Sequence, residues 1–294
     1  MKERIVALGF FDGVHIGHGA LLQKTCELAS QKGATPAVLT YSAHPSEVLA
    51  ANPVKLINTT EERKVLISEL YGIEDVVVKD FTKAYSEMSC ESFVNEIICK
   101  ELCASHVVAG FDFRFGSRGA GDASYLSSLC VEAGIGCDIV DAVMLDGKAV
   151  SSSRIRTMIA EGDIKNAERL LGHPHCVISE VTHGANLGEK IGFPTINQKL
   201  SENIQCPRFG VYFSRVKISG ETFYGVTNIG VRPTVTEENS PRAETNILGF
   251  SGDVYGKTVR LELLDFMRDE IKFESVDDLR RQIASDVEKA KRLF

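Results

Sequence analysis

Residues 9–18 read GFFDGVHIGH, and this stretch decides how the first part of the chain folds. It follows the apolar run Ile5–Leu8, which is typical of a buried parallel strand. It precedes residues 21–29, in which apolar side chains recur with the period of a helix. We therefore predict a strand, a glycine-rich turn and the start of a helix. Such a turn directs backbone N–H groups and the positive end of the helix dipole toward one point, which suits a phosphate group.

The turn contains two histidines, His15 and His18, which a helix would place on the same side of its first turn. Paired imidazoles can donate hydrogen bonds to a polyphosphate as charge develops on its leaving group. A lone histidine in a turn is more often structural, but the order strand, glycine turn and His-x-Gly-His favours a phosphate site. The pattern resembles the signature of the nucleotidylyltransferase superfamily. That resemblance implies attack on the α-phosphate of a nucleoside triphosphate and release of pyrophosphate.

The composition of the chain is that of an ordinary globular protein. It has 294 residues, of which 44% are hydrophobic and 25% are charged, and its net charge is −7. Its length suggests about two domains. The acidic balance argues against a nucleic-acid partner. No apolar stretch approaches the length of a membrane span, and the N-terminus runs directly into the first strand. We therefore expect no membrane partner, no signal peptide and a cytoplasmic location, while the oligomeric state is left open.

Eight cysteines are spread along the chain without a Cys-x-x-Cys pair. Cys99 and Cys103, four apart on a predicted helix, could supply half of a metal site, but no companion cluster lies nearby in the sequence. We expect buried free thiols rather than disulfides, as is usual in a reducing cytosol.

Short apolar runs alternate with helical patterns through the first half of the chain. Strands are predicted at residues 37–41, 76–78, 106–110 and 136–140, and helices at 61–71, 92–103, 125–133 and, as one piece, from about 151 to 171. This alternation predicts an α/β fold with a doubly wound parallel sheet. Gly172-His173-Pro174 ends the last helix, so the predicted domains are residues 1–172 and 173–294.

Downstream the hydrophobic period changes from helical to alternating. Strands are predicted at residues 177–181, 210–216, 223–228 and 258–263, which favours a small antiparallel β-barrel. Asp146-Gly147 and Ser219-Gly220 are typical of tight hairpin turns. A final helix is predicted from Val276 to about Leu293, with Ser275 as its cap. The predicted buried stripe of this helix consists of Val276, Leu279, Ile283 and Val287.

Three further segments of the first domain could carry chemistry. His44 follows a predicted strand, where open α/β sheets bind ligands, although it could equally cap a turn. The loop 110–122 combines three phenylalanines and two arginines, which suits a flat heterocycle bearing phosphate; alternatively its phenylalanines pack inward. Residues 150–156, VSSSRIR, offer hydroxyls, helix N–H groups and two cations to phosphate, although serines there could be only caps.

The order of these motifs carries a closer resemblance. GFFDGVHIGH, GFDFRFG (110–116) and SSSRIR (151–156) resemble the adenylyltransferase module of bacterial bifunctional riboflavin kinase/FAD synthetases. The resemblance implies that ATP is bound by Gly9, Phe11, Asp12, Gly13, His15, His18, Ser152, Ser153, Arg154 and Arg156. It implies catalytic roles for His15, His18 and Arg156. It also implies that flavin is bound by His44, Asp112, Phe113 and Phe115.

The second domain has its own glycine-rich turn at residues 188–197. Its Thr195 hydroxyl and Asn197 amide are hard oxygen ligands suited to Mg²⁺ and phosphate. Glu244 could accept a proton from an attacking hydroxyl, although a single glutamate beside a strand is more often an ordinary surface residue.

Here too the motifs point to a known module. GFPTIN (192–197), GVTNIGVRPT (225–234) and FSGDVYGK (250–257) resemble the riboflavin kinase module of the same family, in the same order. The resemblance implies that Glu244 is the general base, that Thr195 and Asn197 hold Mg²⁺, and that Arg268 binds flavin. The ATP site that it implies consists of Gly188, Lys190, Thr195 and Asn197.

The chain departs from the family pattern at a few positions. Phe10 stands where the family has Asn or a small residue, and Phe111 where Glu is common. Leu187 and Glu189 replace two arginines of the kinase turn, and Asn246 replaces a common His.

The sequence therefore predicts a bifunctional enzyme that uses ATP and Mg²⁺ to convert riboflavin to FMN, and adenylylates FMN to FAD with release of pyrophosphate. Three alternatives stay open. The chain could be a monofunctional FMN adenylyltransferase whose barrel binds flavin without kinase activity. It could be a nucleotidyltransferase for another phosphate ester, or a non-catalytic flavin carrier.

Overall fold

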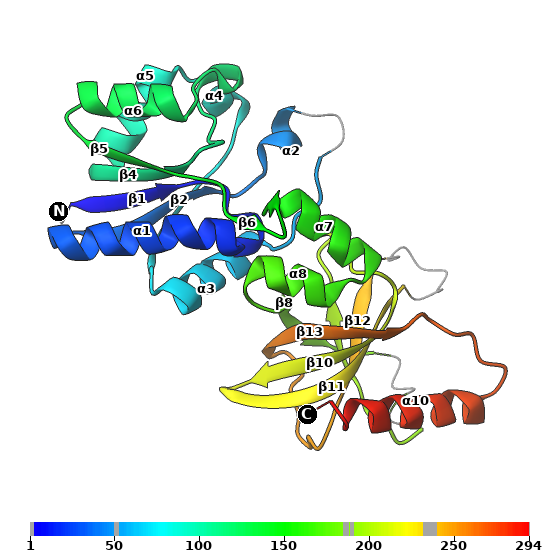
Figure 1. Cartoon of the computed structure of the whole chain (residues 1–294). Coiled ribbons are helices and arrows are strands. Elements are labelled where there is room, and N and C mark those ends of the chain that lie inside the picture. Colours follow the sequence, from blue (N-terminus) through cyan, green and yellow to red (C-terminus); the bar gives the residue numbers. More distant parts are fainter. Residues whose placement is uncertain (1–2, 50–52, 185–187, 189–190, 232–239, 294) are drawn as a thin grey trace. The chain divides into compact units, whose positions relative to one another are not determined.

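The computed structural model describes residues 3–49, 53–184, 188, 191–231 and 240–293 (Figure 1). The chain divides into two compact units. The first comprises Met1–Lys55 and Thr60–Ser152, and the second comprises Leu56–Thr59 and Ser153–Phe294. Almost all of the segment 152–171 thus groups with the second unit, and the domain boundary after residue 172 stays a prediction.

A parallel sheet forms the centre of the first unit. Among the described residues it has five strands in the order β3-β2-β1-β4-β5. They are β1 (Arg4–Leu8), β2 (Thr35–Tyr41), β3 (Asp75–Lys79), β4 (Ala104–Gly110) and β5 (Gly136–Val140). The central strand β1 is apolar because both of its faces are covered, and Ile5, Val6 and Ala7 are completely buried.

Helices cover both faces of this sheet (Figure 1). One face is covered by α1 (Ile16–Lys32) and α3 (Thr60–Tyr71), and the other by α4 (Lys83–Ser86), α5 (Cys90–Ser92), η2 (Phe93–Glu101) and α6 (Ala123–Glu132). The shorter elements are η1 (Asp12–Val14), α2 (Pro45–Leu49), η3 (Ser117–Gly119) and the hairpin of β6 (Met144–Leu145) and β7 (Lys148–Ala149). The predicted doubly wound α/β fold is therefore confirmed.

Two helix predictions are wrong in detail. Residues 93–101 form a π-helix, and Cys103 lies beyond its end with a φ of +49°, so Cys99 and Cys103 do not share a helix. The segment 151–171 forms two helices, α7 (Ser152–Glu161) and α8 (Ile164–Leu171), instead of one. The break falls at Gly162, whose φ of +80° ends α7, and a side chain there would come within 3.1 Å of Arg208.

The second unit contains a closed antiparallel barrel in its described part, in the order β10-β11-β12-β9-β8-β13. Its strands are β8 (His175–Thr182), β9 (Ile196–Lys199), β10 (Gly210–Ile218), β11 (Glu221–Gly230), β12 (Arg242–Ile247) and β13 (Thr258–Arg268). The predicted barrel is therefore confirmed, with β9 and β12 added to the four predicted strands. Both predicted hairpin turns are present, because Asp146-Gly147 and Ser219-Gly220 have positive φ at each residue.

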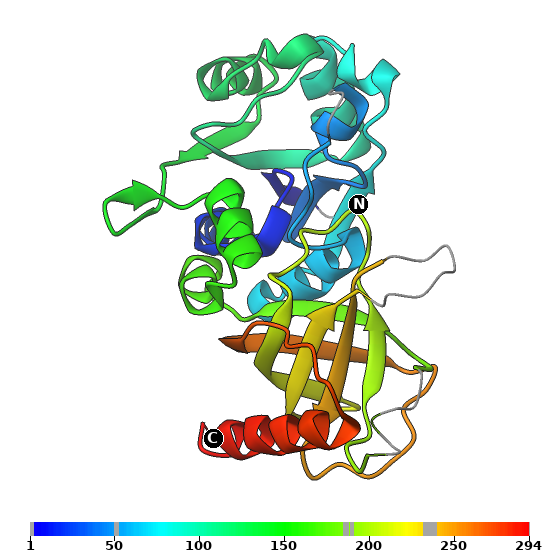
Figure 2. The same ribbon diagram turned by 90° about the vertical axis from the view of Figure 1, so that its right-hand side faces the viewer.

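The final helix, α10 (Val276–Ala290), lies alongside the barrel (Figure 2). Ser275 caps it as predicted, since its Oγ accepts a hydrogen bond of 3.1 Å from Asp278 N. Val287 and Ala290 belong to one buried cluster with Val211 and Phe213 of β10 and Val226 of β11. The predicted stripe is wrong at Val276, which is 55% exposed, because the contact with the barrel is made by the last turns of the helix.

All eight cysteines lie in the described ranges and are free thiols, as predicted, but only Cys90, Cys130 and Cys176 are buried, so the expected burial is wrong for the other five. None of the described helices has the length and apolar character needed to cross a membrane.

One buried histidine predicts a pH effect on stability. His175 in β8 is buried, and its ring nitrogens lack hydrogen-bond partners among the described residues. Burial, with a smaller effect of His173, lowers the pKa of His175 from 6.5 to about 4. The unfolded chain therefore takes up a proton below pH 6.5 that the folded chain does not bind. As the pH falls from 6.5 to 4, we expect the unfolding free energy of the barrel to fall by about 1.4 kcal/mol per pH unit on this account.

Hydrogen exchange of the β8 amides at several pH values measures this slope. His175→Leu should flatten it, whereas His183→Gln, at an exposed position, should leave it unchanged. An identical slope in the wild type and in His175→Leu would show that another group is responsible.

Candidate active sites

The first candidate site is the turn that follows β1 at the carboxyl edge of the sheet. Its backbone is left-handed at three positions, with φ values of +59° at Phe11, +82° at Gly13 and +44° at Val14. This conformation suits glycine but is unfavourable for phenylalanine and especially for the β-branched valine. Both side chains are completely buried, and this packing holds the turn in place. Backbone strain that packing enforces in this way is typical of functional sites.

The two histidines of the turn lie against each other. His15 is the N-cap of α1, and its Nδ1 accepts a hydrogen bond of 3.2 Å from His18 N. The rings stack with centroids 3.6 Å apart and planes 10° apart. Gly17 makes room for this stack, because a Cβ there would lie 3.1 Å from the His15 ring. Both imidazoles therefore occupy one side of the helix start, where the helix dipole is positive.

His18 is a neutral imidazole at neutral pH. Burial, followed by His15 and then by Arg63, lowers the pKa of His18 well below 6.5. Its Nδ1 is buried and has no hydrogen-bond partner within the described parts of the chain. The edge of the Phe11 ring lies against it, with centroids 5.2 Å apart. A neutral imidazole keeps one N–H donor, which a phosphate oxygen can accept.

The serine–arginine motif begins at this turn. Ser152, the first residue of α7, donates a hydrogen bond of 2.9 Å from its Oγ to the Asp12 carbonyl, which joins two segments 140 residues apart in the sequence. One helical turn later, Arg156 donates a hydrogen bond of 3.0 Å to Ser153 Oγ. The hydroxyl of Ser152 thus fixes the start of α7 to the turn after β1.

The aromatic loop after β4 is divided between core and surface. Phe115 is buried and packs on Phe93 and Phe113, with ring centroids 5.3 and 5.8 Å away. Its carbonyl accepts a hydrogen bond from the buried Cys90 thiol. Phe111 is 52% exposed, Asp112 is exposed, and Phe113 is partly buried. The ring of Phe115 is therefore a core group, as in the inward-packing alternative, and the surface of the loop is formed by the residues before it.

The structure bears out the capping alternative for His44, and its role in ligand binding stays a prediction. Its Nδ1 accepts a hydrogen bond of 3.1 Å from Ser46 N, which caps the start of α2. Its ring also lies edge-on to Phe10 in the turn after β1, with centroids 4.8 Å apart. His44 is thus a capping residue that also borders the first site.

The second candidate site is a row of polar side chains on the outer face of the barrel. Glu244 in β12 lies directly opposite Asn197 in β9 and Asn228 in β11. Side chains at directly opposite positions share one face, about 5 Å apart. The neighbours Ala243 and Thr245 are completely buried, so Glu244 lies on the other face of its strand. The result is a carboxylate between two amides.

The glycine-rich turn before β9 is held against this row. Phe193 N donates a hydrogen bond of 2.8 Å to the Gly188 carbonyl, and Asn246 Nδ2 donates one of 2.8 Å to the Pro194 carbonyl. Asn246, the departure from the family's histidine, thus supports the turn. Gly184 passes so close to Asn197 that a Cβ there would lie 2.3 Å from its amide nitrogen. Lys190, like Leu187 and Glu189, lies outside the described residues.

Two family models match successive parts of the chain. Residues 1–154 match the family model of FAD synthetase, and residues 171–294 match that of riboflavin kinase. This chain belongs to the bifunctional riboflavin kinase/FMN adenylyltransferase family. It is 35% identical to the protein of that name from Listeria monocytogenes, over 99% of this chain and 93% of that one. It is 36% identical to the one from Bacillus subtilis, with the same coverage. A crystal structure described as a macrolide-efflux protein from Streptococcus pneumoniae is 32% identical, with a TM-score of 0.85 over 99% of this chain and 94% of that one.

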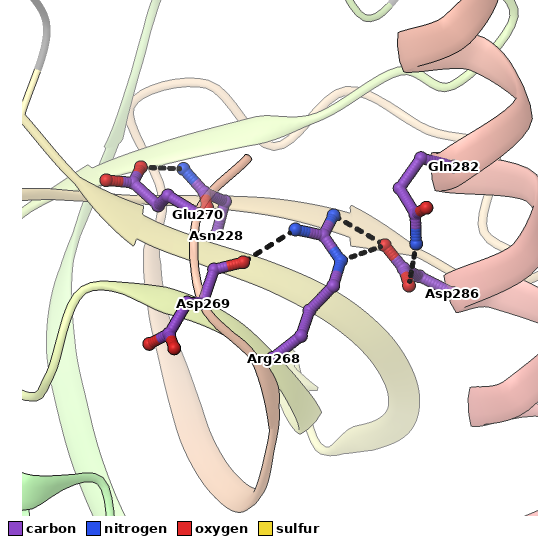
Figure 3. A network of polar contacts seen from close by, with 6 residues as sticks. All are labelled: Asn228, Arg268, Asp269, Glu270, Gln282 and Asp286. Atoms are coloured by element: carbon purple, nitrogen blue, oxygen red, sulfur yellow. Dashed lines mark hydrogen bonds and ion pairs between the residues drawn. The ribbon is translucent and has the colours of Figure 1, made fainter. Parts of the chain in front are cut away.

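Arg268, the predicted flavin-binding residue of the second domain, has its guanidinium bonded to Asp286 and to the Asp269 carbonyl (Figure 3). Its Nε and Nη2 donate to one oxygen of Asp286 in α10 at 3.0 and 2.7 Å, and its Nη1 donates to the Asp269 carbonyl at 2.9 Å. Gln282 donates to the other oxygen of Asp286. Arg268 therefore fastens α10 to the end of β13. Beside it, Asn228 donates a hydrogen bond of 3.2 Å to Glu270, which brings a second carboxylate close to the polar row.

We expect Arg268→Met to destabilise the barrel of this riboflavin kinase domain strongly. Asp286 is 1% exposed, and the substitution would leave its charge buried without a cation. Breaking a buried ion pair from one side costs about 3–5 kcal/mol of unfolding free energy. Urea denaturation of the full chain measures the loss. The double variant Arg268→Met/Asp286→Leu should recover much of it, and Arg281→Met, which removes an exposed ion pair, should have little effect. A single variant as stable as the wild type would rule out this fastening role.

Arg63 is a buried residue beside the first candidate site that the sequence analysis did not single out. It lies in α3 and is completely buried at the ends of β1 and β2. A signal was present, because Arg63 is three residues before Leu66 and four before Ile67, so it falls on the buried stripe of the predicted helix. A cation at such a position calls for a physical explanation.

Proposed function

We propose that this chain phosphorylates riboflavin to FMN and adenylylates FMN to FAD, with a separate active site for each reaction. The observation that carries the proposal is the presence of two separate constellations, each within a region that matches the corresponding family model. One is the stacked pair His15 and His18 in a strained turn at a helix N-terminus. The other is the carboxylate of Glu244 between two amides beside a glycine-rich turn.

In the adenylyltransferase site, an oxygen of the FMN phosphate attacks the α-phosphorus of ATP. The bond from that phosphorus to the bridging oxygen breaks, and pyrophosphate leaves. The proposed ATP-binding residues are Gly9, Phe11, Asp12, Gly13, His15, His18, Ser152, Ser153, Arg154 and Arg156. Backbone N–H groups, imidazole N–H groups and guanidinium groups stabilise the charge that develops on the phosphates, so the protein supplies orientation and electrostatic stabilisation rather than a nucleophile.

For the flavin of this first site we propose His44, Asp112 and Phe113, with Phe115 supporting the ring of Phe113 from the core. Their positions favour this role, because Asp112 is exposed and His44 borders the phosphate turn. The exposed ring of Phe111 adds an apolar surface for a flat heterocycle.

In the kinase site, Glu244 accepts the proton of the ribityl 5′-hydroxyl as its oxygen attacks the γ-phosphorus of ATP, and ADP leaves. Gly188, Lys190, Thr195 and Asn197 bind the nucleotide. Asn197 and Asn228 lie opposite Glu244 on the neighbouring strands, and we propose that they orient its carboxylate. Arg268 supports the flavin site indirectly, by fastening α10 to the barrel.

The donor set of the kinase site fits Mg²⁺. The Thr195 hydroxyl, the Asn197 amide and the Glu244 carboxylate offer hard oxygen ligands. The described residues contain no group of three acidic, histidine or cysteine side chains that would form a complete metal site. We propose that Thr195 and Asn197 hold the ion together with the ATP phosphates, because Mg²⁺ is usually bound by a few protein oxygens and by substrate phosphates. When bound, it neutralises phosphate charge.

We also propose a cytoplasmic location, because the enzyme uses ATP and keeps eight free thiols. Its partners are small-molecule substrates. The net charge of −7 argues against nucleic acid.

Chromatography of the flavins tests the proposal. The chain is incubated with ATP, Mg²⁺ and either riboflavin or FMN. We expect riboflavin to yield FMN and then FAD, and FMN to yield FAD with one pyrophosphate released for each FAD. FAD from FMN without FMN from riboflavin would favour the monofunctional alternative, in which Leu187 and Glu189 have cost the kinase its activity. No flavin product from either substrate would refute both activities.

A further inference from the structure

Arg63 is a buried cation that forms no ion pair among the described residues, although the charges of Asp12 and Glu47 act on it. Its guanidinium donates hydrogen bonds to Thr40 Oγ1 at 3.0 Å, to the Tyr41 carbonyl at 2.8 Å and to Thr60 Oγ1 at 3.0 Å, and also to the Phe10 carbonyl. All four acceptors are neutral. No carboxylate in the described part of the chain forms an ion pair with it.

Such a burial is unfavourable for the unliganded protein. A charge removed from water needs a counter-charge in addition to hydrogen bonds. Burial lowers the pKa of Arg63 to about 10, against the opposing effects of Asp12 and Glu47, so the group stays charged at neutral pH. A buried cation of this kind is expected where the counter-charge arrives with a ligand.

The position of Arg63 indicates which ligand this is. It connects the carbonyls that follow β1 and end β2, at the carboxyl edge where parallel sheets bind ligands. Its guanidinium carbon lies 4.1 Å from the centroid of the Phe10 ring, which His44 contacts edge-on. Two buried nitrogens of this one region, Arg63 Nε and His18 Nδ1, have no hydrogen-bond partner among the described residues. The buried charge of Arg63 and the two buried nitrogens without a hydrogen-bond partner therefore lie at the same turn, the one after β1.

We propose that Arg63 is a positioning residue of the adenylyltransferase site, whose buried positive charge holds the Phe10 turn in place and is balanced by the phosphate charge of the bound substrates. The inference rests on the proposed function of this site. Arg63 does not touch the reacting atoms. It holds the backbone that presents N–H groups to phosphate. The charges of Asp12 and Glu47 act on Arg63, and those of His15 and Arg63 act on His18.

The test compares Arg63→Met, which removes the charge, with Arg63→Lys, which keeps the charge but not the planar fork of donors. Arg4→Met is the matched control, because it removes a partly buried arginine at the opposite end of β1, which pairs with Asp75 at 2.7 Å. All three are made in the full chain. The FAD-forming kcat/KM is measured separately against ATP and against FMN, and riboflavin phosphorylation by the same preparation reports on the integrity of the second unit.

For Arg63→Met we expect a loss of about 10-fold to 100-fold in kcat/KM for FAD formation, with riboflavin phosphorylation unchanged. A rise in KM for ATP identifies the triphosphate as the counter-charge, and a rise in KM for FMN identifies the flavin phosphate. Arg63→Lys should recover part of the loss, and Arg4→Met should match the wild type.

A second readout separates this role from simple packing. Arg63 is one of the groups that lower the pKa of His18, so the titration of His18, followed by NMR of its ring, should move to higher pH in Arg63→Met and not in Arg4→Met.

Several outcomes would overturn the proposal. Arg63→Met could form FAD as well as the wild type, or both Arg63 variants could lose activity equally while the titration of His18 stays in place. If Arg63→Met does not fold, Arg63→Lys decides the matter, and unchanged KM values for both substrates would then refute the role. A wild-type chain that forms no FAD refutes the proposed function itself, whereas an active wild type with an equally active Arg63→Met refutes only the role of Arg63.

Discussion

His18→Ala is expected to stop FAD formation from FMN while riboflavin phosphorylation continues. The imidazole stands at the N-terminus of α1, stacked on His15, and its neutral ring supplies a donor where negative charge develops on the leaving pyrophosphate. Removal of one such donor costs about 100-fold to 1,000-fold in kcat. The measurement is chromatography of FAD formed from FMN and ATP, with FMN formed from riboflavin as the internal reference.

The control for this variant is His183→Ala, which removes an exposed histidine of the second unit. It should leave FAD formation unchanged. Equal loss of both activities in His18→Ala would contradict separate sites. Full FAD synthesis in His18→Ala would remove this histidine from the mechanism.

Glu244→Gln is expected to do the reverse. The substitution keeps the size of the side chain between Asn197 and Asn228 but removes its ability to take a proton. Loss of a general base typically lowers kcat by about 100-fold to 10,000-fold. FMN formation from riboflavin should therefore fall by that amount, while FAD formation from added FMN continues. The same chromatographic assay, started from either flavin, measures both rates.

Glu270→Gln is the matched control, because Glu270 is the second carboxylate near the row and bonds to Asn228. We expect it to alter kcat far less than Glu244→Gln. If FMN production survives in Glu244→Gln and falls in Glu270→Gln, the general base is Glu270 and the assignment from the family motif is wrong.

The elements that the sequence predicts well are those set by neighbouring residues. The continuous apolar run before residue 9 predicts a strand, and the helical spacing of apolar residues after the turn predicts a helix. Both elements are present in the structure. The hairpin turns at Asp146-Gly147 and Ser219-Gly220 follow from residues that accept positive φ. The prediction of a single helix over residues 151–171 is wrong. The apolar period continues through this segment, but Gly162 ends the first helix and Asp163 precedes the second.

The side chains of the two sites depend on distant parts of the chain. Phe115 resembles an exposed ligand-binding aromatic in the sequence, but packing against Phe93 places it in the core. Asn197, Glu244 and Asn228 form a row only because three strands pair in one register.

By itself the sequence determined that an α/β sheet is followed by a β-barrel, where the glycine turns fall and in which order the motifs come. These features depend on contacts between residues a few positions apart. Only the tertiary structure decided that a buried Arg63 lies against the Phe10 turn and that Ser152 bonds to Asp12. The physical reason is that burial and charge compensation are properties of the assembled core. The helix period places Arg63 on an apolar stripe, but the groups that accept its hydrogen bonds are known only once the strands beside it are in place.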